Sequence, residues 1–164
     1  MSSQVLRTQQ TVEPDVNGPW LRFLRAHAAV TRALSARLET LNGMTLSDFD
    51  VLAQLFHTPD QRLRRVDLAR TVLLSASGIT RLLDGLERAG WVEKGSCSSD
   101  ARVTYAVLTE AGEAKFREAQ KTHRADIEEL FASRFNDEER AVLAELLGRL
   151  PMTEAVCTGE AETP

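Results

Sequence analysis

The chain has 164 residues, of which 43% are apolar and 27% are charged, and its net charge at pH 7 is −4. This length and balance are typical of one soluble domain with a real core. No apolar run approaches the roughly 20 residues that cross a bilayer, and the N-terminus lacks an apolar signal segment. We therefore expect a cytoplasmic protein that does not contact a membrane.

The residues that usually carry catalysis or bind metals are sparse. Cys97 and Cys157 are too few for a disulfide framework, which fits a reducing compartment. The three histidines are scattered, and we find neither a cluster with metal-ligand spacing nor a nucleophile motif. We expect no metal, no cofactor and no enzymatic activity.

Positive charge is concentrated in the middle of the chain. Residues 61–105 hold eight Arg or Lys and five Asp or Glu, a local balance of +3. Residues 106–164 hold seven and thirteen, a balance of −6. A basic segment in an acidic chain is compatible with a local surface for phosphate groups, and equally with a mildly basic surface that has no partner.

The chain opens with a polar segment, residues 1–14, that we expect to be disordered. The triplet Asn17-Gly18-Pro19 is then predicted to precede a long helix that stops at Asn42-Gly43. The apolar side chains of this helix recur at helical spacing: Trp20, Phe23, Leu24, His27, Val30, Leu34, Leu38 and Leu41.

Three short elements are predicted next. Thr45 and Asp48 have the spacing of a capping box for a second helix, which Pro59 ends. Residues 61–64 are predicted to form a minor edge strand, and residues 66–72 a compact helix.

The following helix, residues 75–89, has the apolar spacing of a buried face at Ile79, Leu82, Leu83, Leu86 and Ala89. Ser75 is a candidate N-cap, and Gly90 a candidate for the left-handed residue after the helix. With residues 66–72 this helix forms a predicted helix-turn-helix pair.

Two strands follow the pair. Residues 91–94 are predicted to be extended, and residues 102–108 alternate in the period of a strand. The connection, residues 95–101, is too polar to be buried. A helix followed by a β-ribbon with a polar tip is the layout of a winged helix-turn-helix.

Two more helices complete the prediction. Thr109 is expected to cap the first, and Asn136 with Glu139 the second, which Pro151 closes. The last helix is predicted to bury an apolar stripe: Val142, Leu143, Leu146, Leu147 and Leu150. Residues 151–164 form a polar, acidic tail that we expect to be disordered.

These elements predict a mainly α (α+β) fold with a single domain at residues 15–150. Residues 45–109 would form the winged helix lobe, which does not need the outer helices for its own core. The helices in 15–43 and 110–150 have to bury their apolar faces elsewhere, and a second copy of the chain would provide a two-fold partner.

The stretch from Ser75 to Gly112 resembles the MarR family of bacterial transcriptional regulators. The matching residues are the run Ser75–Leu82, Asp84, the helix end Leu86–Gly90, the pair Asp100 and Arg102, and the segment Leu108–Gly112. The resemblance extends from about Trp20 to Leu150. It implies a homodimer that binds near-palindromic operator DNA, usually as a repressor relieved by a small molecule or an oxidant.

The resemblance also implies which residues contact DNA. Arg81 is expected to read a base, the helix N-terminus to meet a phosphate, and Arg102, steadied by Asp100, to reach the minor groove. Asp84 and Arg88 are expected to form an i,i+4 pair. The predicted DNA-binding residues are Arg62, Arg64, Ser75, Ser77, Thr80, Arg81, Lys94, Ser98, Ser99, Asp100 and Arg102. Family wings carry basic residues where this chain has Gly95 and Ala101, which predicts a shallower salt dependence.

Regulation is predicted at two places. An aromatic or anionic effector would bind between the dimer helices and the lobe, where Trp20, His27, Phe49 and Asp50 are candidates. For Trp20 and His27, packing at the dimer interface is the favoured interpretation. Cys97 would act as an oxidant sensor if Lys94 and Arg102 favour its thiolate, or be an incidental surface cysteine.

The sequence is also compatible with a protein of another functional class. The acidic totals are compatible with a winged-helix dimer that binds protein rather than DNA, and binding insensitive to salt would favour it.

Overall fold

The computed structural model describes residues 17–72, 76–96 and 104–150. Predictions for the two terminal tails, for the Ser75 cap and for the closure at Pro151 lie outside these residues. The described helices are α1 (Asn17–Asn42), α2 (Leu46–His57), η1 (Pro59–Gln61), α3 (Arg65–Thr71), α4 (Ala76–Arg88), α5 (Glu110–Leu130), η2 (Ala132–Arg134) and α6 (Asp137–Gly148). The described strands are β1 (Arg62–Arg64), β2 (Val92–Ser96) and β3 (Thr104–Leu108).

The three strands form an antiparallel sheet with the order β1-β3-β2. Leu63 of β1 is opposite Ala106, which in turn is opposite Lys94 of β2. The predicted edge strand is therefore confirmed, one residue shorter than expected. It begins after Asp60 and Gln61, which both adopt positive φ angles and so cannot continue a strand.

Local capping chemistry is confirmed at three helices. The Thr45 and Asn136 side chains each accept a hydrogen bond from the third residue of their helix, and Asp48 and Glu139 complete the two capping boxes. Thr109 Oγ1 accepts from the Gly112 amide at the start of α5. These contacts join residues only three positions apart, which is why sequence spacing predicted them.

The helix ends agree with the predicted stops, with one exception at a start. Gly43 and Gly90 have φ angles of +63° and +76°, the left-handed conformation that glycine adopts without a side-chain clash. However, α1 begins at Asn17 rather than after Pro19. Proline is tolerated in the first helical turn because the amide it lacks has no partner there.

The core of the winged lobe includes residues from the outer helices, contrary to our expectation. Leu38 of α1 and Phe116 and Ala119 of α5 are at most 1% exposed within one cluster with the lobe residues. The Phe116 ring lies 5.3 Å from that of Phe49 and 4.9 Å from that of Phe56. The lobe therefore depends on α5 for its own packing.

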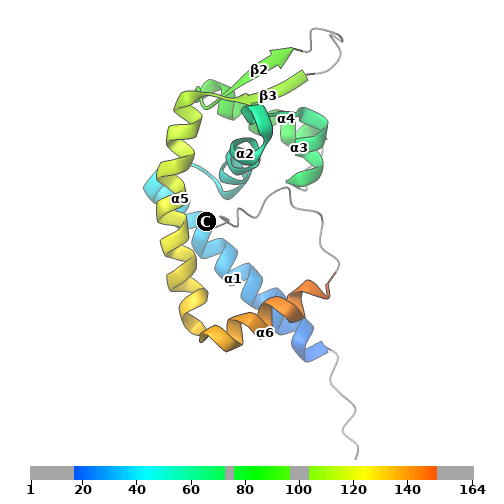
Figure 1. Ribbon diagram of the computed structural model, residues 1–164, viewed down its shortest axis with the longest axis vertical. Helices are drawn as coiled ribbons and strands as arrows, with labels where there is room; N and C mark the ends of the chain where they lie inside the picture. The colour runs from blue at the N-terminus through cyan, green and yellow to red at the C-terminus, as the bar shows by residue number, and fades with distance from the viewer. Residues whose placement is uncertain (1–16, 73–75, 97–103, 151–164) are drawn as a thin grey trace, which may run out of the picture.

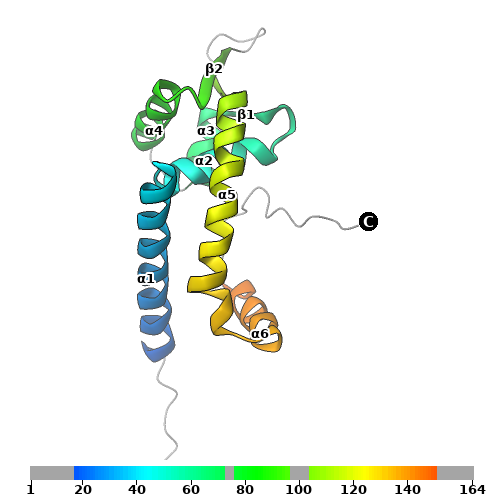
Figure 2. The same ribbon diagram turned by 90° about the vertical axis from the view of Figure 1, so that its left-hand side faces the viewer.

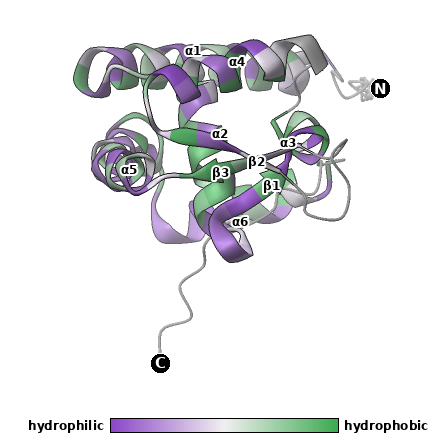
Figure 3. Cartoon of the chain, turned by 90° about the horizontal axis from the view of Figure 1, so that it is seen from above, coloured by the Kyte–Doolittle hydropathy of each residue, from purple (hydrophilic) through white to green (hydrophobic). Residues whose placement is uncertain are grey.

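The outer helices α1 and α5 extend away from the lobe in the same direction. In Figures 1 and 2, α1 and α5 leave the lobe on the same side, and α6 lies at the opposite end of the molecule from α4 and the β-ribbon. Seen from above, apolar and polar residues alternate along α1 (Figure 3).

The predicted burial of the α6 stripe does not occur within the single chain. Val142, Leu146 and Leu150 are 56%, 48% and 47% exposed. The reason is geometric: α6 lies far from the lobe, and one face of it is left without a covering element. Trp20, Phe23 and Leu24 on the N-terminal half of α1 are exposed in the same way.

Gly112 allows the close approach of α5 to the wing. A Cβ atom at this position would lie 2.0 Å from the backbone oxygen of Trp91. We expect Gly112→Ala to lower the free energy of unfolding by about 1–3 kcal/mol or more, because backbone atoms have to move. Urea denaturation measures this change.

The matched control is Gly85→Ala in α4, where a Cβ would meet no atom within 4 Å. This substitution is expected to raise stability by about 0.5–1 kcal/mol, because alanine favours the helix. Equal effects of the two substitutions would contradict the role given to Gly112.

Candidate nucleic-acid interface

The orientation of α4 is set by the face that it buries. Ile79, Leu83 and Leu86 are at most 3% exposed and pack in the lobe core, as the helical spacing predicts. The opposite face therefore points outward, and it carries Thr80 and Arg81, which are both exposed. This is the geometry that a recognition helix needs.

Arg81 is the residue on this face that is best placed to contact a base. Within the described part of the chain, its guanidinium makes no hydrogen bond or ion pair, so all of its donors are available to a partner. A guanidinium presents two parallel N–H groups, which match the O6 and N7 acceptors of guanine. Ser77 lies in the first turn of α4, but its side chain is outside the described atoms, as is all of Ser75.

Two further predicted residues, Arg62 and Arg64, lie on the edge strand β1. Both side chains are exposed, while Leu63 between them is half-buried. Arg62 lies over the Tyr105 ring, with its guanidinium carbon 5.0 Å from the ring centre. Arg64 lies 3.8 Å from the Asp67 carboxylate. These two arginines present positive charge on the same face of the strand, which suits phosphate contact.

Lys94 is paired within the chain. Its ammonium lies 2.8 Å from Glu87 and 3.9 Å from Asp84, both on α4. Strand β2 runs back beside α4 and brings the lysine to these carboxylates. Lys94 is thus a weaker candidate for a phosphate contact than Arg64. Its positive charge is balanced by Glu87 and Asp84, which reduces its ability to stabilise a thiolate at Cys97.

The predicted side-chain pair between Asp84 and Arg88 is not formed. Arg88 Nε donates instead to the backbone oxygen of Asp84, at 3.1 Å. The Asp84 carboxylate faces Lys94, a residue from another element. The tertiary contact replaced the pair that helical spacing favours.

The tip of the wing, which holds Cys97, Ser98, Ser99, Asp100 and Arg102, lies outside the described residues. The base of the wing is described, and it is attached to α5. Thr109 Oγ1 donates to the Gly90 oxygen at 2.7 Å, and the Thr109 amide donates to the Trp91 oxygen at 3.1 Å. The sequence predicts Trp91 as the first residue of an extended segment, whereas β2 begins at Val92 and the Trp91 backbone oxygen accepts the contact from Thr109.

Comparisons with known proteins agree with this geometry. A sequence profile of the MarR family matches residues 44–104. An uncharacterised HTH-type transcriptional regulator of Bacillus cereus is 30% identical over 131 residues, which cover 80% of this chain and 85% of the relative. The chain belongs to the MarR family.

One further relative and two solved structures are similar. The HTH-type transcriptional repressor YetL of Bacillus subtilis is 32% identical over 66% of this chain and 64% of its own length. The MarR-family regulator Sco3205 of Streptomyces coelicolor, solved in complex with DNA, has a TM-score of 0.75 and 26% identity over 79% of this chain and 81% of its own. A mutant MarR of E. coli complexed with operator DNA has a TM-score of 0.71 and 26% identity over 82% and 96%.

The MarR-family chain is therefore a DNA-binding transcriptional regulator of the helix-turn-helix type, and not an enzyme. In the described ranges, no cluster of three or more His, Cys, Asp or Glu could hold a metal ion. Nor does any helix in those ranges combine the length and the apolar character needed to cross a membrane.

The four predicted effector residues of this MarR-family chain lie in different surroundings. A cavity of about 520 Å³ lies between α1 and the segment from Phe131 to α6, and of the four only His27 lines it. Trp20 is 56% exposed near the start of α1. Phe49 is buried in the lobe core, where its ring lies 4.5 Å from that of His123. An effector contact at Phe49 stays a prediction, and its packing in the core is what the structure describes.

We expect two arginines of the interface to differ in what they contribute. Arg81→Ala should weaken binding to a selected duplex by about 1–3 kcal/mol more than binding to random DNA, because it removes a base contact. Arg64→Ala should weaken both equally and lower the salt slope by about one, because it removes a phosphate contact. Fluorescence anisotropy at several salt concentrations measures both effects.

Arg124→Ala is the matched control, because Arg124 is exposed on α5, away from this face. Unchanged affinity in both test variants, or an equal loss in the control, would show that these contacts are wrongly assigned.

Asp50 predicts a pH dependence of stability. Burial raises the pKa of its carboxyl to about 6, although part of the residue remains exposed. The folded state then holds the proton more tightly than the unfolded state, so the stability that Asp50 contributes is present below about pH 4 and lost as the pH rises through about 6. Asp50→Asn should therefore stabilise the protein more at about pH 7.5 than at about pH 4.5.

Urea denaturation of the parent and the Asp50→Asn variant at the two pH values tests this expectation. Glu93→Gln, at an exposed carboxylate on β2, is the control and should show no such difference. A stability gain for Asp50→Asn that is independent of pH would contradict it.

Proposed function

We propose that this MarR-family regulator is a homodimeric repressor of near-palindromic operator DNA that a small aromatic or anionic effector releases. The observation that carries the dimer is the apolar surface left uncovered at one end of the chain. It is made of Trp20, Phe23, Leu24, Ile127, Phe131, Val142, Leu146 and Leu150, each between 38% and 56% exposed.

This surface lies on the N-terminal part of α1, at the end of α5 and on α6, at the opposite end of the molecule from α4 and the sheet (Figure 2). Large apolar side chains that are exposed together at one end of a molecule are typical of an interface. A second copy is the occupant that we propose, because an isologous contact at this end leaves both α4 helices free for DNA. Two-fold symmetry would then match the symmetry of a palindromic operator.

The repressor role is supported by the name of one relative, the transcriptional repressor YetL. Steric exclusion of polymerase is the simplest consequence of tight operator binding by a dimer. Reporter expression from the regulated promoter, compared with and without the chain, distinguishes repression from activation.

The effector site that we propose is the cavity beside His27. His27, in an apolar cavity with Arg22 at its edge, offers the chemistry that an aromatic anion would need. A panel of aromatic carboxylates added to the anisotropy assay tests this part. Failure of every compound to release DNA would refute it and leave the dimer and its DNA binding standing.

The dimer interface is tested by placing a charge on the apolar face of α6. Leu146→Glu should convert the dimer to a monomer and strongly weaken DNA binding, because a carboxylate cannot be buried unpaired in an apolar interface. Light scattering gives the mass, and anisotropy against a duplex that the parent selects from a random pool gives the affinity.

Ala144→Glu is the matched control, because Ala144 is exposed on the opposite face of the same helix. A parent chain that is monomeric at assay concentrations would overturn the proposal, as would an unchanged mass for Leu146→Glu.

A further inference from the structure

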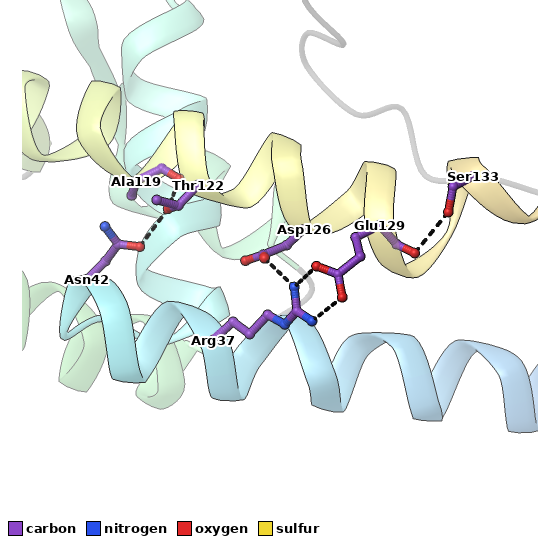
Figure 4. Close-up of polar contacts among 7 residues, drawn as sticks. All are labelled: Arg37, Asn42, Ala119, Thr122, Asp126, Glu129 and Ser133. Carbon is purple, nitrogen blue, oxygen red and sulfur yellow. Dashed lines mark hydrogen bonds and ion pairs between the residues drawn. The ribbon is translucent and has the colours of Figure 1, made fainter.

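A polar clamp joins α1 to α5 between the lobe and the proposed dimer surface. Arg37 Nη1 donates to Asp126 Oδ1 at 2.6 Å, and its two terminal nitrogens donate to the two oxygens of Glu129 at 2.9 and 2.7 Å (Figure 4). One turn of helix closer to the lobe, Thr122 Oγ1 donates to Asn42 Oδ1 at 2.9 Å. We call Arg37, Asp126 and Glu129 the α1–α5 clamp.

The clamp is geometrically demanding. A guanidinium that binds a carboxylate through two parallel hydrogen bonds has only one favourable orientation. The Asp126 side chain is 11% exposed, so its charge depends on Arg37 for compensation. The Arg37 guanidinium also holds the pKa of the Glu129 carboxyl below its ordinary value. A sliding or rotation of α1 against α5 would break these contacts together.

The position of the clamp means that a small movement there is amplified along α1. On its lobe side, Leu38 and Phe116 anchor the two helices in the core. On the other side, α1 continues from Arg37 to Asn17, which at 1.5 Å per residue is about 30 Å of helix. A small change of crossing angle at Arg37 therefore becomes a large displacement at the far end of α1.

We propose that the α1–α5 clamp consists of positioning residues for DNA binding, which set the separation of the two recognition helices. The inference rests on the proposed dimer, because only there does the angle between α1 and the lobe determine where the partner's α4 lies. A buried ion pair adds little net stability compared with apolar packing, but it does define geometry. A dimer that must match half-sites one helical turn apart needs that geometry.

The test compares Arg37→Ala with Arg32→Ala, an exposed arginine on the same helix. Glu129→Gln, which leaves the Arg37–Asp126 contact in place, is compared with Glu128→Gln, an exposed neighbour. Each variant is first shown by urea denaturation to be folded at the assay temperature. Binding is then measured on the duplex that the parent selects, and on duplexes whose half-sites are one base pair closer or further apart.

We expect Arg37→Ala to bind the selected duplex about tenfold more weakly, as coupled networks of this kind allow. It should also lose the preference among the three spacings, and Glu129→Gln should weaken that preference in the same direction. The two controls should behave like the parent. An affinity loss that is equal at all three spacings would indicate a merely structural role and overturn the proposal.

A second measurement needs neither DNA nor a dimer. Nitroxide labels at Ala28→Cys in α1 and Glu93→Cys in β2, with Cys97 and Cys157 replaced by serine, report the distance between α1 and the lobe in chains diluted with unlabelled protein. Arg37→Ala should broaden this distance distribution. An unchanged distribution would overturn the clamp even in a confirmed dimer. A broadened distribution in a monomeric chain would retain the clamp and remove the dimer.

If Arg37→Ala proves unfolded, Glu129→Gln decides the inference alone. It supports the clamp if it shifts both the spacing preference and the distance distribution, and it overturns the clamp if it shifts neither or only one of them.

Discussion

The packing of the first half of α5 into the winged lobe is the constraint on which the rest of the structure depends. Phe116 fills the space between Phe49 and Phe56, and Gly112 lets the helix start directly against the Trp91 backbone. Thr109 joins the same helix start to the base of the wing. One helix therefore holds the core, orients the wing and then leaves the lobe towards the proposed dimer surface. Any displacement of α5 is felt at all three places, because packed interiors transmit strain.

Basic and acidic side chains are concentrated on different elements of the structure. Exposed arginines gather on α4 and β1, whereas α5 and α6 carry an acidic excess. The net charge of −4 conceals this arrangement, since it averages a basic interface with acidic helices. Acidic helices remote from DNA favour one orientation of the protein on the duplex, because the opposite orientation would bring like charges together. The winged helix and its relatives make DNA the partner, and the acidic totals no longer favour a protein partner.

The ion pairs of this protein differ in their exposure and in how strongly they restrict the elements that they join. The Lys94 contacts with Glu87 and Asp84 are partly exposed and hold β2 beside α4 with little energetic weight. The α1–α5 clamp is bidentate towards the exposed Glu129, includes the buried carboxylate of Asp126, and spans 89 and 92 positions of sequence. Contacts of this second kind restrict the relative movement of helices that otherwise touch through apolar side chains. In the proposed dimer, that restriction would keep the two recognition helices at a fixed separation.

The sequence by itself determined what depends on neighbours within a few residues. The capping contacts of Thr45, Thr109 and Asn136, the left-handed glycines and the buried face of α4 follow from helical spacing, and all are present. Only the tertiary structure decided what depends on residues far apart in sequence. It packed Phe49 against Phe116, gave Lys94 its carboxylate partners, drew α5 into the lobe and joined Arg37 to Asp126 and Glu129. The physical reason is that local hydrogen bonds are specified by backbone geometry, whereas a contact between distant residues exists only after burial of apolar surface has brought their elements together.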